Sequence, residues 1–479
     1  MILQENSFDS QHMQKDNFFQ KPYSVHALLF FLFIAAGVVY NIVKYSGDFV
    51  DTAGAYGGAI QNGLAATVRG LYYIFTGPDV LVRDYIYVGG FGSTLVNVGL
   101  AGLLAVVALK LARHTPSGLT MGTFGLVIGF AFFGKNIVNM MPIIVGGFLY
   151  GLIHCALVER APFDKCVLRA VLATCLAPVI TQAIHFNPAL TLAEGVAVGI
   201  ATGFFVGYFI NPIAMHVEAA HKGYNLYNIG WAAGIVGMAI FVIFRVLGTH
   251  PEVQNDWSTG YTVHLTVLLA TVSGYFIIVG VLGSLTKRAL HVSVTDSQNC
   301  GAISQNSKKI RLREFFMFHK YDIDFFAQLR EKTYIHMGIM GLMCLVFMLI
   351  VRGEYNGPVI GAILSVVGFG AYGKTILTAV PLMAGAMLAA VIASMEGTIG
   401  TQFNHPSFLV AAIFSTCLSP FVKKFGMGAG LAAGFLHLAF AVNIAGFHGG
   451  LNLYNNGFAG GLTVVVLLPI ITILKEGKP

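Results

Sequence analysis

The sequence predicts an all-α polytopic membrane protein built from two internal repeats. Of its 479 residues, 56% are hydrophobic and only 10% are charged. Soluble domains average about 25% charged residues, so this composition excludes an ordinary soluble enzyme. The apolar residues form long runs, and three sequence blocks recur in the same order in the second half. The net charge of +7 does not predict nucleic-acid binding, because the densest basic run is one loop between apolar segments.

Apolar segments along the chain are the predicted membrane spans. A helix needs about 20 mostly apolar residues to cross a bilayer, and on this criterion we expect about 10 to 14 spans. The segments 120–133 and 358–371 are too short to cross alone and are predicted half-helices or re-entrant pieces. The segment 57–77 is either an amphipathic interfacial helix or a short packed helix between loops. The other predicted spans are 27–44, 94–112, 137–157, 167–183, 190–211, 228–247, 262–285, 334–351, 375–395, 408–422, 427–445 and 457–474.

Polar and charged segments give the chain its predicted organisation and orientation. Residues 1–24 form a polar N-terminal tail, and we expect no cleavable signal peptide because the apolar run 27–44 lacks a cleavage site. The stretch 286–333 holds nine basic residues against five acidic ones, which predicts a cytoplasmic linker in a protein of a bacterial inner membrane. An alternative role for this linker is contact with lipid headgroups or a partner. The first membrane repeat is then 25–285 and the second 334–479.

The internal repeat rests on three blocks that keep their order. Duplicated membrane folds usually place the transported species between the repeats, where broken helices expose backbone groups. The repeat therefore predicts a transporter or channel, and an inverted-repeat transporter is one of the architectures that fit it. Whether the halves are parallel or inverted depends on whether each has an even or an odd number of spans. The aligned blocks are 97–142 with 336–381, 174–178 with 416–420, and 221–230 with 448–457.

A lysine stands at the same place in both repeats. Lys135 and Lys374 each follow a predicted half-helix and precede a longer apolar segment. A lysine within an apolar stretch is costly, roughly 2.5–3.5 kcal/mol on insertion scales. One interpretation is that both lysines and nearby backbone N–H groups face an anion. The other is that both lie between short helices and reach lipid headgroups with their ammonium groups.

Asparagine and tyrosine recur in the third block of the repeat. The motif His-x-Gly-x-Asn-Leu-Tyr-Asn-x-Gly opens a small-residue-rich helix in each half. Asparagine is a natural helix N-cap, which is one interpretation; the other is that paired Asn side chains line a polar pore and replace water around a solute. The predicted substrate-binding residues are Lys135, Lys374, Tyr224, Asn225, Tyr227, Asn228, Asn452, Tyr454 and Asn455.

The segments 223–237 and 451–462 resemble a Gly-Tyr-Asn-x-x-Leu-x-Gly stretch that recurs in each half of bacterial and animal urea channels. By that resemblance the architecture would be urea-channel-like, with two repeats and broken helices. Tyr224 and Asn225, with Asn452 in the second half, would contact the solute, and the protein would be a homo-oligomer, usually a trimer. The chain departs from the pattern: the leucine is out of place, and Leu-Pro-x-x-Thr-x-Pro-Phe is present only as a fragment. As a whole, the sequence is more similar to a bacterial family of uncharacterised multi-pass integral membrane proteins.

Titratable residues near the motifs are candidates for proton coupling. His221 and His448 are twins in the repeat, and Glu218 lies three residues before His221, on the same helical face. The alternative for the histidines is a helix-capping or interfacial role, and Ala445 stands where a twin of Glu218 would fall. Neither a metal site nor a cofactor is predicted, because the histidines and the six cysteines do not form ligand sets with metal spacing.

The predicted function is transport or conduction of a small polar solute along a path between the repeats. One hypothesis is passive conduction of a neutral solute by the Asn and Tyr pairs. The alternative is proton- or sodium-coupled secondary transport of a small anion by the lysines. A third hypothesis is a membrane scaffold or enzyme without transport; no catalytic residue is predicted, because the sequence contains no nucleophile elbow, phosphate loop or zinc-protease motif.

Overall fold

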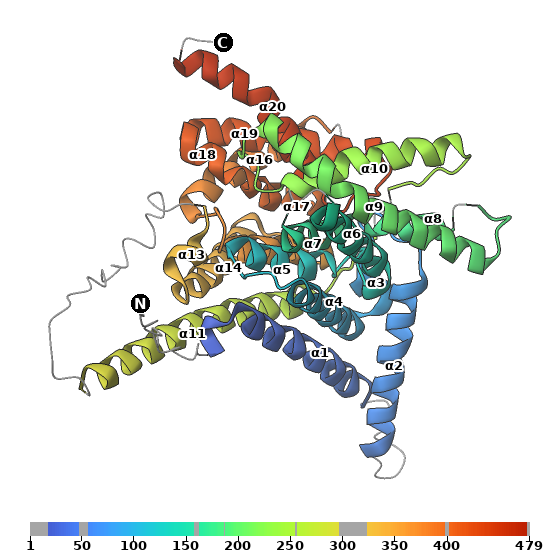
Figure 1. Cartoon of the computed structure of the whole chain (residues 1–479), viewed down its shortest axis with the longest axis horizontal. Coiled ribbons are helices and arrows are strands. Elements are labelled where there is room, and N and C mark those ends of the chain that lie inside the picture. Colours follow the sequence, from blue (N-terminus) through green and yellow to red (C-terminus); the bar gives the residue numbers. More distant parts are fainter. Residues whose placement is uncertain are drawn as a thin grey trace, which may run out of the picture.

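The computed structural model of the chain describes residues 18–46, 56–157, 162–185, 187–253, 256–296, 323–397 and 402–476. Within these ranges every regular element is a helix, and 12 helical segments are long and apolar enough to cross a membrane, as expected from the sequence. The chain is therefore an all-α, multi-pass membrane protein (Figure 1).

The helices follow the apolar runs of the sequence closely. The first half contains α1 (Pro22–Ser46), α2 (Tyr56–Thr76), α3 (Tyr85–Gly89), α4 (Phe91–Leu111), α5 (Gly118–Phe130), α6 (Ile137–Leu157), α7 (Phe163–Ala173), α8 (Ala177–Ile184), α9 (Leu192–His221), α10 (Asn228–Val246) and α11 (Thr262–Asp296). The second half contains α13 (Phe325–Leu329), α14 (Lys332–Val351), α15 (Gly357–Phe369), α16 (Ile376–Met395), α17 (Pro406–Phe414), α18 (Ser419–Phe425), α19 (Met427–Asn443) and α20 (Asn455–Glu476).

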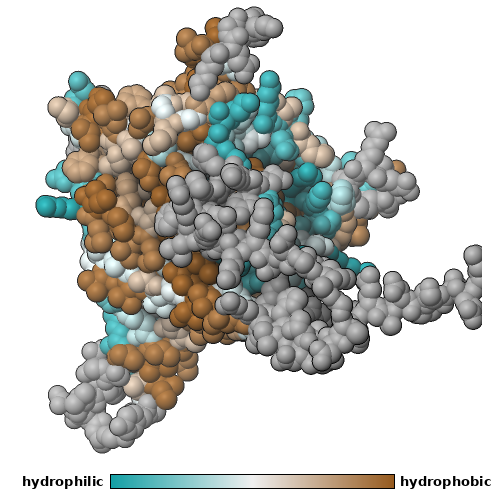
Figure 2. All heavy atoms as spheres, turned by 90° about the vertical axis from the view of Figure 1, so that its left-hand side faces the viewer, coloured by the Kyte–Doolittle hydropathy of each residue, from teal (hydrophilic) through white to brown (hydrophobic). Residues whose placement is uncertain are grey.

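The outer surface of the helices is apolar, as a lipid environment requires. Val43, Leu349 and Leu474 are 65%, 65% and 78% exposed. Apolar side chains cover much of the face drawn in Figure 2, and hydrophilic ones gather in patches. The helix predicted over 57–77 is α2, whose apolar residues Ile60 and Val68 point away from the protein. That exposure favours contact with lipid, and α2 runs at a steep angle to α1 in Figure 1.

The two predicted half-helices, α5 and α15, form the centre of the molecule. Each has 13 residues, which gives a length of about 20 Å, too short for a hydrocarbon core of about 30 Å. They pack against each other in antiparallel directions, since Gly118 lies beside Ala371 and Gly357 lies beside Phe132. A Cβ at Gly125 would be 2.8 Å from the Cα of Gly368, so only glycine permits this approach.

Two spans predicted as single helices are interrupted. A 3₁₀ turn at Thr174–Leu176 separates α7 from α8, and one at Ser415–Leu418 separates α17 from α18. A proline follows each turn in the first turn of the next helix, where its missing N–H costs nothing. These breaks leave carbonyl groups free of helical hydrogen bonds in the middle of the protein.

Helix α11 defines two sides of the molecule. Its N-terminus follows Trp257, and its C-terminus leads to residues 297–322, which lie outside the described residues. The predicted linker 286–333 is thus partly helical: α11 reaches Asp296 and α13 begins at Phe325. The apolar part of α11 has 25 residues, a length of about 37 Å. We call the end at residues 297–322 the linker side and the other end the far side.

Helices α4 and α14 cross between these sides in opposite directions. Phe91, at the start of α4, stacks on Tyr261 just before α11, so α4 begins on the far side. At the end of α14, the N–H of Tyr355 donates to Thr262 at the start of α11, at 3.4 Å. Helix α14 therefore ends on the far side, where α4 begins.

Candidate functional site

Residues 222–227 and 449–454 form the two loops that carry the Asn-Leu-Tyr motif, and we call them the Asn-Tyr loops. Each is hydrogen-bonded to the opposite half of the chain. The N–H of Leu226 donates to the carbonyl of Cys417 at 3.0 Å, and that of Leu453 donates to the carbonyl of Cys175 at 2.9 Å. These carbonyls belong to the 3₁₀ turns that interrupt the two broken helices. Each loop of one half therefore closes the helix break of the other half.

The first asparagine of each motif, Asn225 or Asn452, forms hydrogen bonds with backbone groups around it. Asn225 accepts from the N–H of Tyr227 at 3.0 Å and donates to the carbonyl of Gly457 at 3.0 Å. Asn452 repeats this pattern, accepting from Tyr454 at 2.9 Å and donating to Gly230 at 3.4 Å. Their amide groups hold the two loops together across the halves. They neither cap a helix nor offer a free amide to a solute.

The twin histidines hold the second asparagine of each motif. Asn228 donates to the carbonyl of Ala214 and Asn455 to that of Ala441, so each amide oxygen is the acceptor for its histidine. His221 and His448 donate from Nε2 to these oxygens, both at 2.9 Å. Their Nδ1 atoms accept backbone N–H groups, from Gly223 and Asn452. Both rings therefore sit as neutral tautomers with both nitrogens in use, an arrangement suited to holding loops in place.

The other predicted residues lie apart from this centre. Glu218 is exposed near the end of α9. Tyr224 is half-buried against Phe421 and Phe425, with ring centroids 6.0 and 5.4 Å away. The loops thus bring Tyr227 and Tyr454 into the centre, but not Tyr224 or Glu218.

Both lysines are buried and do not reach the lipid. Lys135 is 1% exposed and Lys374 is 0% exposed. Each follows a glycine with positive φ, 75° at Gly134 and 79° at Gly373, a conformation that favours glycine. The loops that carry them are fixed by α4 and α14. Asn97 donates to the carbonyl of Lys135 at 3.0 Å, and at the aligned position His336 donates to that of Gly370 at 2.6 Å.

The environments of the two ammonium groups differ. Lys374 donates to the hydroxyl of Tyr227 and, at 2.8 Å, to that of Thr416. Lys135 lies over the ring of Phe130, 5.1 Å from its centroid. Neither lysine forms an ion pair with any residue that the structure describes.

Aromatic rings fill the space between the two lysines. The rings of Tyr227 and Tyr454, one from each motif, have centroids 4.7 Å apart. Phe130 packs on Tyr454 at 5.3 Å, and Phe369 packs on Tyr227 at 5.0 Å. Phe414 contacts both tyrosines and Phe130. We call Phe130, Tyr227, Phe369, Phe414 and Tyr454 the aromatic cluster.

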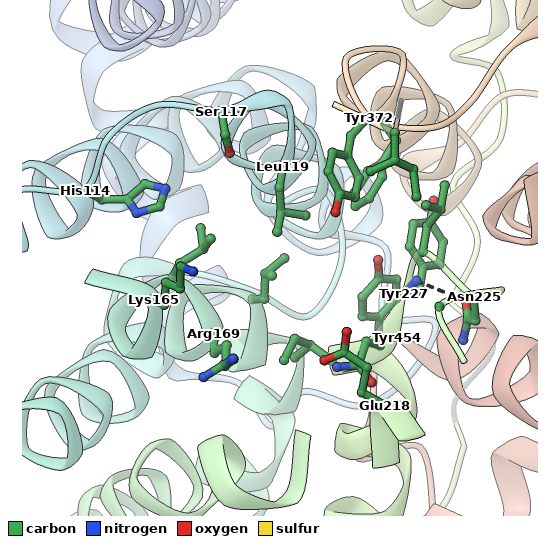
Figure 3. Close-up of a pocket in the computed structure, with 18 of the residues that line it drawn as sticks. His114, Ser117, Leu119, Lys165, Arg169, Glu218, Asn225, Tyr227, Tyr372 and Tyr454 are labelled. Carbon is green, nitrogen blue, oxygen red and sulfur yellow. Dashed lines mark hydrogen bonds between the residues drawn. The ribbon is translucent and has the colours of Figure 1, made fainter. Parts of the chain in front are cut away.

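A cavity of about 600 Å³ reaches the aromatic cluster from the linker side. Its lining includes Ile323, directly after residues 297–322, and ends at Tyr227 and Tyr454. Figure 3 shows Lys165 and Arg169 on α7 and the two tyrosines next to one another. The charged residues of this linker-side cavity are Asp164, Lys165, Arg169 and Glu218.

A second cavity, of about 690 Å³, reaches the cluster from the far side. Its lining includes Val253 and Trp257, which precede α11, and also Phe414 and Leu453. Among the described residues that line it there is no Asp, Glu, Lys or Arg. The aromatic cluster therefore separates two cavities that lie on opposite sides of the molecule.

Two aspartates that sequence analysis missed cap the half-helices across the halves. Asp84, just before α3, accepts from the N–H of Gly357 at the start of α15, at 2.9 Å. Asp324, just before α13, accepts from the N–H of Gly118 at the start of α5, at 3.0 Å. Extending the alignment of the repeats upstream by some 12 residues, with a shift of one residue, would have paired them.

Comparison with known proteins identifies a family but no characterised relative. No curated protein and no solved structure matches the chain. The resemblance to urea channels has no support in these comparisons, whereas the prediction of an uncharacterised family of membrane proteins is confirmed. A family model matches residues 64–246 and 319–473, well over half of the chain, and the protein therefore belongs to the family described as "Protein of unknown function (DUF1576)".

Proposed function

We propose that the protein is a secondary transporter of a small anion, coupled to protons or sodium, whose path joins the two cavities through the aromatic cluster. The observation that carries this proposal is a pair of buried lysines beside that cluster, Lys135 and Lys374, neither of which has a carboxylate partner among the described residues. We place it in a bacterial inner membrane with residues 297–322 in the cytoplasm, following the charge of the linker.

The electrostatics of the centre favour an anion over a neutral solute. Removing an ammonium group from water costs several kcal/mol unless another charge compensates for it. An arriving anion would supply that compensation at Lys135 or Lys374, and the N-terminal dipoles of neighbouring helices would assist. Passive conduction of a neutral solute by the asparagines has less support, because the amides of Asn225 and Asn452 are bonded to the backbone.

The same proposal includes a duplicated, inverted architecture. Its support is the opposite direction of α4 and α14, which carry aligned sequences, and the reciprocal capping by Asp84 and Asp324. In this arrangement the first repeat ends before α11, near residue 260, and α11 begins the second repeat as the counterpart of α1. Inverted repeats can expose one central site to each side of the membrane in turn.

Flux in proteoliposomes tests the function. The full chain is reconstituted, and uptake of neutral solutes such as urea is compared with uptake of small organic and inorganic anions, with and without imposed pH and sodium gradients. We expect gradient-driven uptake of an anion and no uptake of urea. Flux of urea alone, or of no solute, would contradict the proposal, the latter favouring a scaffold or enzyme.

Substitution of the lysines tests the site. Lys135→Met and Lys374→Met keep the length of the side chain and remove its charge. We expect each to lower anion flux at least about tenfold, the loss expected for one hydrogen bond to a charged group. Lys110→Met is the matched control, because Lys110 is exposed at the end of α4, and it should leave flux unchanged. Normal flux in either buried-lysine variant would show that the path lies elsewhere.

A further inference from the structure

We infer that the transported anion is a monocarboxylate with an apolar body, and that in this conformation it binds Lys135 and Tyr454 and not Lys374. The inference rests on the proposed function and deepens it. Its basis is a difference between two sites that are otherwise equivalent: Lys374, Tyr227 and Phe369 in one, and Lys135, Tyr454 and Phe130 in the other.

The Lys374 site is closed by its own hydrogen bonds. The ammonium donates to the hydroxyls of Tyr227 and Thr416, and lies over the ring of Tyr227 at 4.5 Å. An anion would have to break these contacts before it could accept from Lys374. The hydroxyl of Tyr227 is likewise engaged as the acceptor of that bond.

The Lys135 site has donors that are not in use. The hydroxyl of Tyr454 is buried and has no hydrogen-bond partner among the described residues. Lys135 likewise forms no side-chain hydrogen bond within the described part of the chain; its ammonium lies over Phe130. Buried polar groups are rarely left unpaired, because each unmade bond costs about 1–3 kcal/mol.

Phe130 is a common neighbour of the two residues whose donors are unused. The Lys135 ammonium is 5.1 Å from the centroid of its ring, and the ring of Tyr454 is 5.3 Å from the same centroid. Tyr454 also lines the linker-side cavity, so this cavity extends to the ring that carries the unused hydroxyl. A carboxylate between them would accept from the phenol and from the ammonium, and bonds with ionised partners are the stronger kind.

The charge and walls of the site define the class of ligand. One ammonium makes no hydrogen bond to the described residues, so one negative charge is balanced, while a dianion would retain an uncompensated charge in a buried site. The neighbouring walls are the rings of Phe130 and Phe414. The far-side cavity has no charged residue among its described lining, so the ligand passing through it benefits from an apolar body.

Binding to the purified full chain tests this inference. Equilibrium dialysis with radiolabelled benzoate, butyrate and sulfate measures affinity in wild type and in the twin variants Tyr454→Phe and Tyr227→Phe. We expect a monocarboxylate to bind more tightly than sulfate. Tyr454→Phe should weaken its binding about tenfold or more, whereas Tyr227→Phe, which removes the same hydroxyl from the twin site, should not weaken it.

The lysine variants provide a second measurement. Lys135→Met should abolish carboxylate binding, whereas Lys374→Met should keep binding while losing flux. Equal weakening by both tyrosine variants, or loss of binding in Lys374→Met with binding kept in Lys135→Met, would overturn the assigned site. Tighter binding of sulfate would overturn the ligand class and leave anion transport intact. Flux of urea with no anion bound would overturn the proposed function itself.

Discussion

The two cavities share a framework but differ in chemistry. Both end at the aromatic cluster, and both are lined by the first turns of an interrupted helix and by an Asn-Tyr loop. At aligned positions the linker-side cavity has Lys165, Arg169 and Glu218, where the far-side cavity has Ser407, Ala411 and Ala445. The aligned positions thus occupy corresponding places in the two cavity walls, while the charges at these positions differ. We expect the common centre to determine whether an anion passes, and the linings to determine from which side it is captured.

The largest effect on stability is expected at the contact between α5 and α15, where the two halves meet. A side chain at Gly129 would collide with the carbonyl oxygen of Gly361, so Gly129→Val must separate α5 from α15. We expect a loss of about 3 kcal/mol or more in the free energy of unfolding, seen as aggregation or a much lower melting temperature of the purified protein. Gly274→Val is the control, because a Cβ at Gly274 meets no atom within 4 Å. Equal stability of the two variants would contradict the close crossing.

The next largest effects are expected at the crossed caps, the contacts of Asp84 with Gly357 and of Asp324 with Gly118. The two contacts should contribute unequally to stability. Asp84 accepts from Gly357, Ile86 and both donors of Ser258, whereas Asp324 accepts from Gly118 and Ala327. Asp84→Ala should therefore lower the free energy of unfolding by about 2 kcal/mol or more, and Asp324→Ala should lower it by about 1 kcal/mol. Thermal unfolding of the two variants measures the difference; a larger loss in Asp324→Ala would contradict it.

Exchanging charge between the two cavities tests whether their linings determine the side from which an anion is captured. Arg169→Ala should lower anion uptake from the linker side, by up to about tenfold at low salt, and less at high salt because the field is screened. Ala411→Arg should raise uptake from the far side. Arg245→Ala is the control, since Arg245 is exposed and lines neither cavity. Effects independent of salt would indicate a structural role for Arg169.

A separate test concerns a pH dependence of the protein's stability that arises in the first half. Burial raises the pKa of the Asp79 carboxyl from 3.8 to about 7, against the opposing influence of Arg83 and of hydrogen bonds from Tyr85 and Asn139. The folded protein therefore holds this proton more tightly than the unfolded chain. The resulting stability is full below about pH 4 and declines as pH rises to about 7. Asp79→Asn should flatten the melting temperature across this interval, whereas an unchanged slope would assign the dependence to another group.

Sequence patterns predicted those features that leave a local signal. The spans follow from apolar runs, α5 and α15 follow from their short length, and Lys135 and Lys374 stand out as charges within apolar segments. The break after α7 was missed, because Pro178 in the first turn of α8 does not interrupt the hydropathy pattern.

Features that depend on contacts between residues far apart in the sequence could not be predicted from local patterns. The amide of Asn225 is occupied by Gly457, 232 residues further along the chain, so its holding role has no local signature. Asp84 and Asp324 lay just outside the aligned blocks. The lining of the linker-side cavity was missed because Lys165 and Arg169 resemble ordinary charges at the end of a span.

The crossed caps bear on how the protein is made. The N–H of Gly118 donates to Asp324, which is synthesised 206 residues later. While the ribosome is still producing α11, the first half is therefore in the membrane without the Asp324 contact at the start of α5 and without the loop that closes its broken helix. Neither half forms its native centre alone. A polypeptide cut within residues 297–322 should assemble only when both fragments are synthesised in the same cell.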